Sequence, residues 1–271
     1  MLAAILLLPR LLAGGAEPPA GAIQLSVPQI ERRPNEASAT RNPWINSNGW
    51  RMLRSPKRSF FYRVTGDAAA LAAAEAFSYD TAALISSDAS GAESCGRMLE
   101  FLRQIPRLKL APVADIGIID DGSAETGEVM NLLGRFNLLY RIVKSPDKRL
   151  RVNVRLGTPE FPRKEALNPT LVAHKVRSMV GDENRSVRVY GSDVVVSRLL
   201  ADAQRARLHL VNYSNRPIRG LRLRVRGEYS KGEARIFGLT GVKLEDWTFD
   251  GQATEFTIPE LGPYAVVDLS K

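Results

Sequence analysis

Carboxylates gather in one short loop that follows an apolar run, residues 113–119, typical of a buried strand. The acidic side chains of this loop and of the helix expected after it are Asp120, Asp121, Glu125 and Glu128. Such a group can supply a catalytic acid and base, coordinate a hard cation or accept hydrogen bonds from sugar hydroxyls. The structural alternative is that Ser123 or Thr126 caps the helix, because acids are also favoured near a helix N-terminus. The four carboxylates are therefore candidates for catalysis, and the capping interpretation stays open beside it.

A second candidate site combines two indole rings with amide side chains. Its members are Trp44, Asn46, Asn48 and Trp50. Indole faces stack on sugar rings, and amides hydrogen-bond to sugar hydroxyls, so this segment is a candidate ligand-binding site. The alternative is a buried lid over the first strand.

A third candidate is a row of arginines in a strand near the C-terminus. Arg222, Arg224 and Arg226 alternate with apolar residues, so in a strand they share one face. That face is either an ordinary solvated surface or a contact for an anionic glycan or cell-envelope polymer.

The remaining reactive side chains are expected in packing or surface roles. His174 is expected within a helix and His209 within a strand, and neither has a Cys or Ser nucleophile motif to serve. The single cysteine, Cys95, excludes an internal disulfide and any cysteine-built zinc site. The sequence has no phosphate-binding glycine loop and no His pair with metal-ligand spacing, so we expect no metal site and no cofactor.

The chain is basic, with 38 Lys and Arg residues against 29 Asp and Glu residues and a net charge of +9. The arginines are spread along the chain, and no nucleic-acid-binding motif accompanies them, so no nucleic-acid partner is expected. The charge favours an acidic polysaccharide or anionic cell surface, with a solvated basic surface as the alternative.

The N-terminus resembles a secretory signal. An apolar run, residues 2–12, is interrupted only by Pro9 and Arg10 and leads to small residues, which predicts cleavage near Ala16 or Ala20. The alternatives are a membrane-anchored or disordered N-terminus and a truncated start. No later segment is long and apolar enough to cross a bilayer, so we expect a secreted or periplasmic protein.

Strand and helix patterns alternate from residue 60 to about residue 180, which predicts parallel strands with crossover helices. From about residue 186 the apolar period becomes two, and turn signals separate short runs. The predicted fold is an α/β domain with mainly parallel strands followed by an all-β antiparallel sandwich. The predicted segments are a signal peptide (1–20), an extended lead-in (21–43), the α/β domain (44–184) and the sandwich (185–271).

Parts of the chain resemble multidomain β-galactosidase-type glycoside hydrolases. Residues 115–121, 128–133 and 137–141 resemble the glutamine-amidotransferase-like domain that follows the catalytic barrel in those proteins. Residues 207–213, 255–259 and 264–267 resemble their small C-terminal sandwich, and residues 68–77 and 82–85 resemble the last helix and strand of the barrel. The resemblance divides the α/β domain into a barrel-remnant-like part (44–106) and an amidotransferase-like part (107–184).

The resemblance implies an accessory or degenerate glycosidase-like protein. A complete barrel takes about 250 residues, so none fits ahead of these domains. Cys95 lacks the Gly-x-Cys-x-Gly elbow of an amidotransferase nucleophile, and no His-x-Glu follows late in the domain. We therefore expect an exported, non-catalytic carbohydrate-associated protein. The alternatives are an active glycoside hydrolase that uses the acidic loop and a cell-envelope interaction module.

Overall fold

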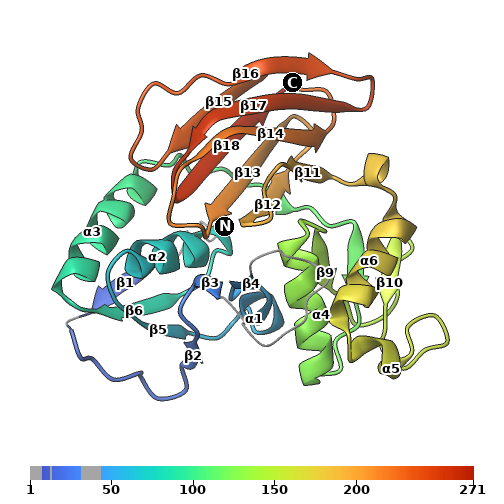
Figure 1. Ribbon diagram of the computed structural model, residues 1–271, viewed down its shortest axis with the longest axis horizontal. Coiled ribbons are helices and arrows are strands. Elements are labelled where there is room, and N and C mark those ends of the chain that lie inside the picture. The colour runs from blue at the N-terminus through green and yellow to red at the C-terminus, as the bar shows by residue number, and fades with distance from the viewer. Residues whose placement is uncertain (1–7, 13, 32–43) are drawn as a thin grey trace.

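The computed structural model describes residues 8–12, 14–31 and 44–271. Parallel sheets with helices occupy the N-terminal part of the chain, and antiparallel sheets form the C-terminal part, as the sequence predicts. In Figure 1 the antiparallel strands lie across the top, above two separate groups of helices and parallel strands.

The first α/β unit is built on a parallel sheet. Within the described residues its strand order is β1-β6-β5-β2. The strands are β1 (Arg10–Leu12), β6 (Ala83–Ser87), β5 (Phe60–Val64) and β2 (Ile23–Leu25). Helix α2 (Ala68–Ser78) follows β5, and α3 (Ala89–Arg103) follows β6. Asp88 caps α3 by accepting a hydrogen bond from the Gly91 amide at 2.9 Å, which fixes where this helix begins.

Regular structure begins before Trp44, earlier than the sequence indicates. Strand β1 lies inside the segment predicted as a signal peptide, and Leu11 packs against the hydrophobic core of the first unit. Strands β2 and β3 (Gln29–Glu31) lie inside the predicted lead-in, and β3 pairs with β4 (Trp44–Asn46). Three-residue strands are too short to produce a visible period, which is why the sequence did not reveal them. The rest of the predicted signal and lead-in, residues 1–7, 13 and 32–43, lies outside the described residues.

The second α/β unit has a parallel sheet of its own, in the order β10-β8-β9 among the described strands. Its elements are β8 (Ile116–Ile118), α4 (Ala124–Arg135), β9 (Tyr140–Ile142), β10 (Val152–Val154), α5 (Arg163–Ala166) and α6 (Pro169–Val180). Strand β8 is central and parallel to both neighbours, and all three of its residues are buried, as its apolar sequence predicts. The parallel strands are thus divided between two sheets, and the division falls between α3 and β8. The alternation of strands and helices did not indicate this division, whereas the resemblance divided the α/β domain at residues 106–107.

The sandwich consists of two antiparallel sheets that begin after a 3₁₀ turn, Asp182–Asn184. One sheet contains β11 (Val187–Tyr190), β14 (Ile218–Arg226), β17 (Ala253–Leu261) and β16 (Glu245–Phe249). The other contains β15 (Lys231–Ile236), β18 (Tyr264–Ser270), β13 (Arg205–Asn212), β12 (Val195–Ala201) and β7 (Ala111–Pro112). Strand β7 belongs to the segment that connects the two α/β units, and it pairs with β12 of the sandwich. The connecting segment is therefore joined to the sandwich by backbone hydrogen bonds.

The hydrophobic cores show how the three parts are joined. The core of the first unit includes Val211, Tyr213 and Tyr264 of the sandwich, whereas the second unit packs around a core of its own residues. A further core fills the space between the two sheets of the sandwich. The first unit therefore shares its core with the sandwich. The second unit is joined to the sandwich by buried hydrogen bonds, in which the Asn137 side chain donates to the Val195 carbonyl at 2.9 Å and accepts from the Ser197 amide at 2.6 Å. Among the described residues, no helix has the length and apolar composition needed to cross a membrane.

Candidate functional site

The acidic loop and the tryptophan segment, which are far apart in the sequence, meet in the structure. Helix α1 (Gly49–Arg54) packs on α4, which begins directly after the acidic loop. Gly127 lies so close to the Trp50 ring that a Cβ atom there would come within 2.8 Å of it. Two of the three predicted sites are therefore parts of one surface between α1 and α4.

Asp120 is held by an arginine from α1. The Arg54 guanidinium donates two parallel hydrogen bonds to the two Asp120 oxygens, each at 2.8 Å, and a third to the Ser123 carbonyl at 3.0 Å. Asp120 also accepts a hydrogen bond from the Gly122 amide at 3.0 Å. Bidentate Arg–carboxylate pairs are among the strongest hydrogen-bonded contacts in proteins. Asp120 thus fixes the loop to α1.

Asp121 supports the start of α4. Its carboxylate accepts hydrogen bonds from the Ser123 amide at 3.0 Å and the Thr126 hydroxyl at 2.8 Å, and it pairs with Arg163 of α5. Ser123 is the N-cap, because its hydroxyl accepts from the Thr126 amide at 3.2 Å. Partial burial raises the pKa of Asp121, but the hydrogen bonds from Ser123, Thr126 and Arg163 outweigh it and hold that pKa well below its usual range. A carboxyl group that stays ionised in this way cannot donate a proton near neutral pH.

Glu125 and Glu128 lie on α4 itself and are partly buried. Glu125 is in the first turn, where the helix dipole favours a negative charge. Burial lowers the pKa of Arg51 on α1, and the charge of Glu128 opposes that effect. Neither glutamate makes a hydrogen bond or ion pair within the part of the chain that the structure describes. Of the four candidate acids, these two are therefore the ones that have no such partner among the described residues.

The two tryptophans are partly buried, and cations cover them. The Arg51 guanidinium lies 4.2 Å from the centroid of the Trp50 ring, and that of Arg135 lies 4.3 Å from the Trp44 ring. The sequence analysis predicted that the indole faces stack on a sugar ring. In the structure, one face of each ring contacts an arginine in a cation–π interaction.

The two amides of this segment serve buried networks. Asn46 accepts a hydrogen bond from the Ser26 hydroxyl at 2.9 Å and donates to Glu31 at 3.2 Å. The Asn48 side chain is fully buried and donates to Glu75 at 3.0 Å. Their contacts give both amides a structural use.

Each arginine of the row on β14 has a hydrogen-bond partner within the protein. Arg222 donates to Glu255 at 2.7 Å, and Arg226 donates to the Asn184 carbonyl at 3.3 Å. The Arg224 side chain is only 2% exposed and pairs with Asp250 at 3.2 Å. The partners of Arg222 and Arg224 lie on strand β17 and in the turn after β16, and the sequence pattern did not reveal them. Arg226 is exposed, and its partner is a backbone carbonyl in the turn before β11.

The histidines and the cysteine are placed as the sequence predicts. His174 lies on α6, exposed, with its ring 5.1 Å from that of Phe136. His209 is fully buried in β13, with Nδ1 2.6 Å from the Tyr264 hydroxyl and Nε2 without a partner in the described structure. Cys95 is buried in α3, and burial raises the pKa of its thiol to about 11. Within the described ranges, no group of three or more His, Cys, Asp or Glu side chains is arranged to hold a metal ion.

Sequence analysis missed one polar centre, built around Glu75. The Glu75 side chain is fully buried in α2. It accepts hydrogen bonds from the backbone N–H of Asn48 at 2.6 Å and from the hydroxyl groups of Tyr62 at 2.6 Å and Tyr213 at 2.5 Å. Burial and the neighbouring Glu75 raise the pKa of both tyrosines well above the usual value. Tyr213 belongs to the sandwich, so Glu75 ties the first unit to it. The available signal was a single acid within an otherwise apolar, alanine-rich helix.

Comparison with known proteins gives a fold and no family. No protein-family model and no curated protein matches the chain. The α-L-fucosidase isoenzyme 2 of Paenibacillus thiaminolyticus aligns with a TM-score of 0.62 and 9% identity, over 79% of this chain and 61% of that one. The chain therefore shares its fold with part of this α-L-fucosidase.

Two other solved structures align too loosely to support an argument. A cycloisomaltooligosaccharide glucanotransferase of Paenibacillus sp. gives a TM-score of 0.26 at 11% identity, over 56% of this chain and 27% of that one. An α-amylase of H. orenii gives a TM-score of 0.21 at 10% identity, over 82% of this chain and 56% of that one. The chain spans less than two thirds of the length of each of these three proteins.

Proposed function

We propose that this protein is an exported, non-catalytic, carbohydrate-associated protein with a glycosidase-like fold. The observation that carries the proposal is the engagement of the acidic loop. Asp120 is clamped by Arg54, and Asp121 supports the cap of α4. Glycosidic bonds are normally cleaved by one carboxyl group that donates a proton and a second that acts as base or nucleophile. Two of the four candidate carboxylates are thus used to build the loop.

The finer assignment follows the sequence resemblance. The first unit would correspond to the end of a β-galactosidase-type barrel, and the second to the amidotransferase-like domain after it. The alignment with an α-L-fucosidase supports the glycosidase-like part of this assignment. The comparison with β-galactosidase-type proteins remains our proposal.

The rival function is an active glycoside hydrolase. Glu125 and Glu128 favour it, because both are partly buried and neither has a hydrogen-bond or ion-pair partner among the described residues. An assay of the purified chain against aryl glycosides and oligosaccharides, together with a binding screen on immobilised glycans, separates the two functions. We expect glycan binding without turnover. Sustained turnover of any of these substrates contradicts the proposal, and absence of both binding and turnover favours the cell-envelope interaction module.

Export is the least direct part of the proposal. It rests on the apolar N-terminal run, and cleavage near Ala16 or Ala20 would remove β1 from its pairing with β6. Intact-mass measurement of the protein recovered from its native compartment gives the mature N-terminus. A mature chain in the periplasm or medium supports export, and recovery only from the cytoplasm contradicts it.

A further inference from the structure

A basic pocket lies in the second α/β unit, at the amino ends of strands β8 and β10. It has a volume of about 390 Å³ and is lined by Ala114, Asp115, Lys148, Arg149, Leu150 and Arg151. The acidic loop follows the carboxyl end of β8, so this pocket lies at the opposite edge of the sheet. The pocket is therefore separate from the candidate site described above.

The charges of this pocket are only partly satisfied by the protein. Asp147 forms ion pairs with Arg141 at 2.5 Å and with Arg149 at 2.8 Å. In the described part of the chain, the side chains of Lys148 and Arg151 form no hydrogen bond or ion pair. This differs from the arginine row on β14, where each guanidinium has a partner.

Asp115 supplies the acidic side chain in the lining of the pocket. Its two carboxylate oxygens accept hydrogen bonds from the Ser186 amide at 2.8 Å and the Ser186 hydroxyl at 2.7 Å. A carboxylate has about four acceptor positions, so Asp115 keeps capacity for further donors such as hydroxyl groups. A pocket with cations and one such carboxylate suits a ligand that carries both anionic groups and hydroxyls.

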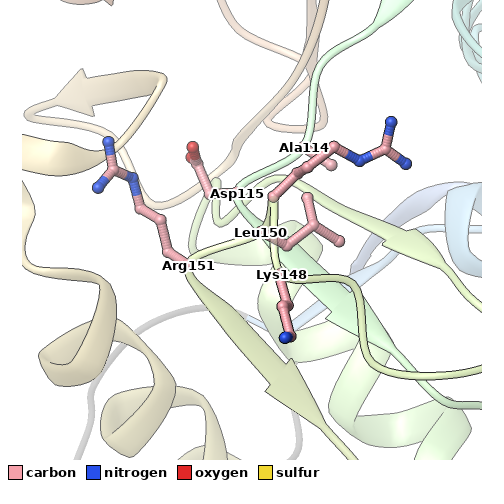
Figure 2. A pocket seen from close by; sticks show the side chains of 6 residues that line it. Ala114, Asp115, Lys148, Leu150 and Arg151 are labelled. Atoms are coloured by element: carbon pink, nitrogen blue, oxygen red, sulfur yellow. The ribbon is translucent and has the colours of Figure 1, made fainter.

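The directions of the side chains indicate the size of that ligand. In Figure 2 the side chains of Arg151 and Asp115 extend to the same side of the pocket, and Lys148 extends to the other. The two cations therefore point to different sides of the pocket. A chain that presents negative groups at intervals can contact them in turn.

We infer that this pocket binds an acidic polysaccharide, one with carboxylate or sulfate groups on successive sugar rings. The inference rests on the proposed carbohydrate-associated function and names its ligand class. Arg151 and Lys148 contact the anionic groups, and Asp115 accepts hydrogen bonds from ring hydroxyls. Nucleic acid fits less well, because the pocket has no aromatic side chain on which bases could stack.

The test is calorimetric titration of the full chain with an oligogalacturonate, a sulfated dextran oligomer, neutral dextran, sodium sulfate and a short DNA duplex. The test variant combines Lys148→Gln with Arg151→Gln. The control combines Lys231→Gln with Lys243→Gln, which removes the same charge from exposed positions in the sandwich. Circular dichroism confirms that both variants are folded.

We expect one or both acidic oligosaccharides to bind, and the test variant to weaken that binding about tenfold while the control changes it less than about twofold. Equal loss in the two variants would mean diffuse attraction to the net charge and would overturn the inference. Equally tight binding of sulfate alone or of DNA would also overturn it. If only neutral glycans bind, and both variants bind them as the wild type does, this inference fails while the proposed function stands.

Discussion

Glu75 and Asp120 are carboxyl groups that the fold uses in different ways. Glu75 is fully buried, accepts hydrogen bonds from uncharged donors and joins the first α/β unit to the sandwich. Asp120 is partly exposed, pairs with a cation and fixes one loop to the neighbouring helix α1. The sequence pointed to the loop, because its acids are clustered, and passed over the lone acid in a helix. Clustering of acids is thus a weaker guide to a buried polar centre than an isolated acid in an apolar segment.

The largest effect is expected from Glu75→Gln. The amide keeps the shape of the side chain but turns one acceptor into a donor that faces other donors, so the free energy of unfolding should fall by about 3 kcal/mol. Urea denaturation measures this. The control is Glu93→Gln, an exposed residue paired with Arg97, which should change stability by less than about 0.5 kcal/mol. A similarly small change in the free energy of unfolding of both variants would show that Glu75 does not stabilise the contact between the first unit and the sandwich.

His209, at the contact between the first α/β unit and the sandwich, should make the stability of the protein depend on pH. Burial, together with the charges of Arg207 and Arg198, lowers the pKa of His209 well below its usual value. The His209 side chain takes up a proton near pH 6.5 in the unfolded chain but stays neutral in the folded chain. Its contribution to the free energy of unfolding is therefore complete above that pH and is lost as the pH falls below it.

Urea denaturation between pH 7.5 and 5 tests this pH dependence in two variants. His209→Gln should flatten the decline at low pH, whereas His174→Gln, at the exposed histidine, should leave it unchanged. An unchanged slope in the His209 variant would contradict the assignment.

The clamp on the acidic loop should have an intermediate effect. A double-mutant cycle of Arg54→Gln and Asp120→Asn should give a coupling energy of about 1 to 2 kcal/mol, because the pair is bidentate and mostly buried. The exposed pair Arg97 and Glu93, tested by the same cycle, should give less than about 0.5 kcal/mol. Equal coupling in the two pairs would mean that the clamp is an ordinary surface contact.

The smallest effect concerns the cap of α4. Ser123→Ala removes the acceptor for the Thr126 amide and should lower the free energy of unfolding by about 1 kcal/mol. Ser178→Ala, at an exposed position within α6, provides the comparison and should be close to neutral. Thermal unfolding of the two variants side by side distinguishes them, and a neutral Ser123 variant would remove the capping interpretation.

The sequence predicted the long, periodic elements well. It indicated the alternating strands and helices between residue 60 and about residue 180 and the buried strand β8, because these segments have a clear period or an apolar run. It missed β16, most of whose residues are exposed and which therefore lacks an apolar period. The periodicity did not divide the parallel strands into two sheets, since strand pairing depends on contacts between distant segments. Only the resemblance suggested a division of the α/β domain, at residues 106–107.

The candidate site was predicted only in part. The capping of α4 by Ser123 is local, so the sequence could indicate it. The Arg54 clamp on Asp120 spans 66 residues, and the partners of the arginine row lie on other strands or in turns. Such long-range charge pairing cannot be read from residue types and spacing, and it decides which charged groups remain available to a ligand.

The central claim is that the acidic loop builds structure and does not catalyse. The most direct test measures both unfolding free energy and glycoside turnover for Asp120→Asn, Asp121→Asn, Glu125→Gln and Glu128→Gln. We expect no turnover by the wild type or any variant, with stability losses of about 0.5 to 2 kcal/mol confined to the Asp120 and Asp121 variants. Wild-type turnover that one of these substitutions abolishes, in a variant as stable as the wild type, would contradict the claim.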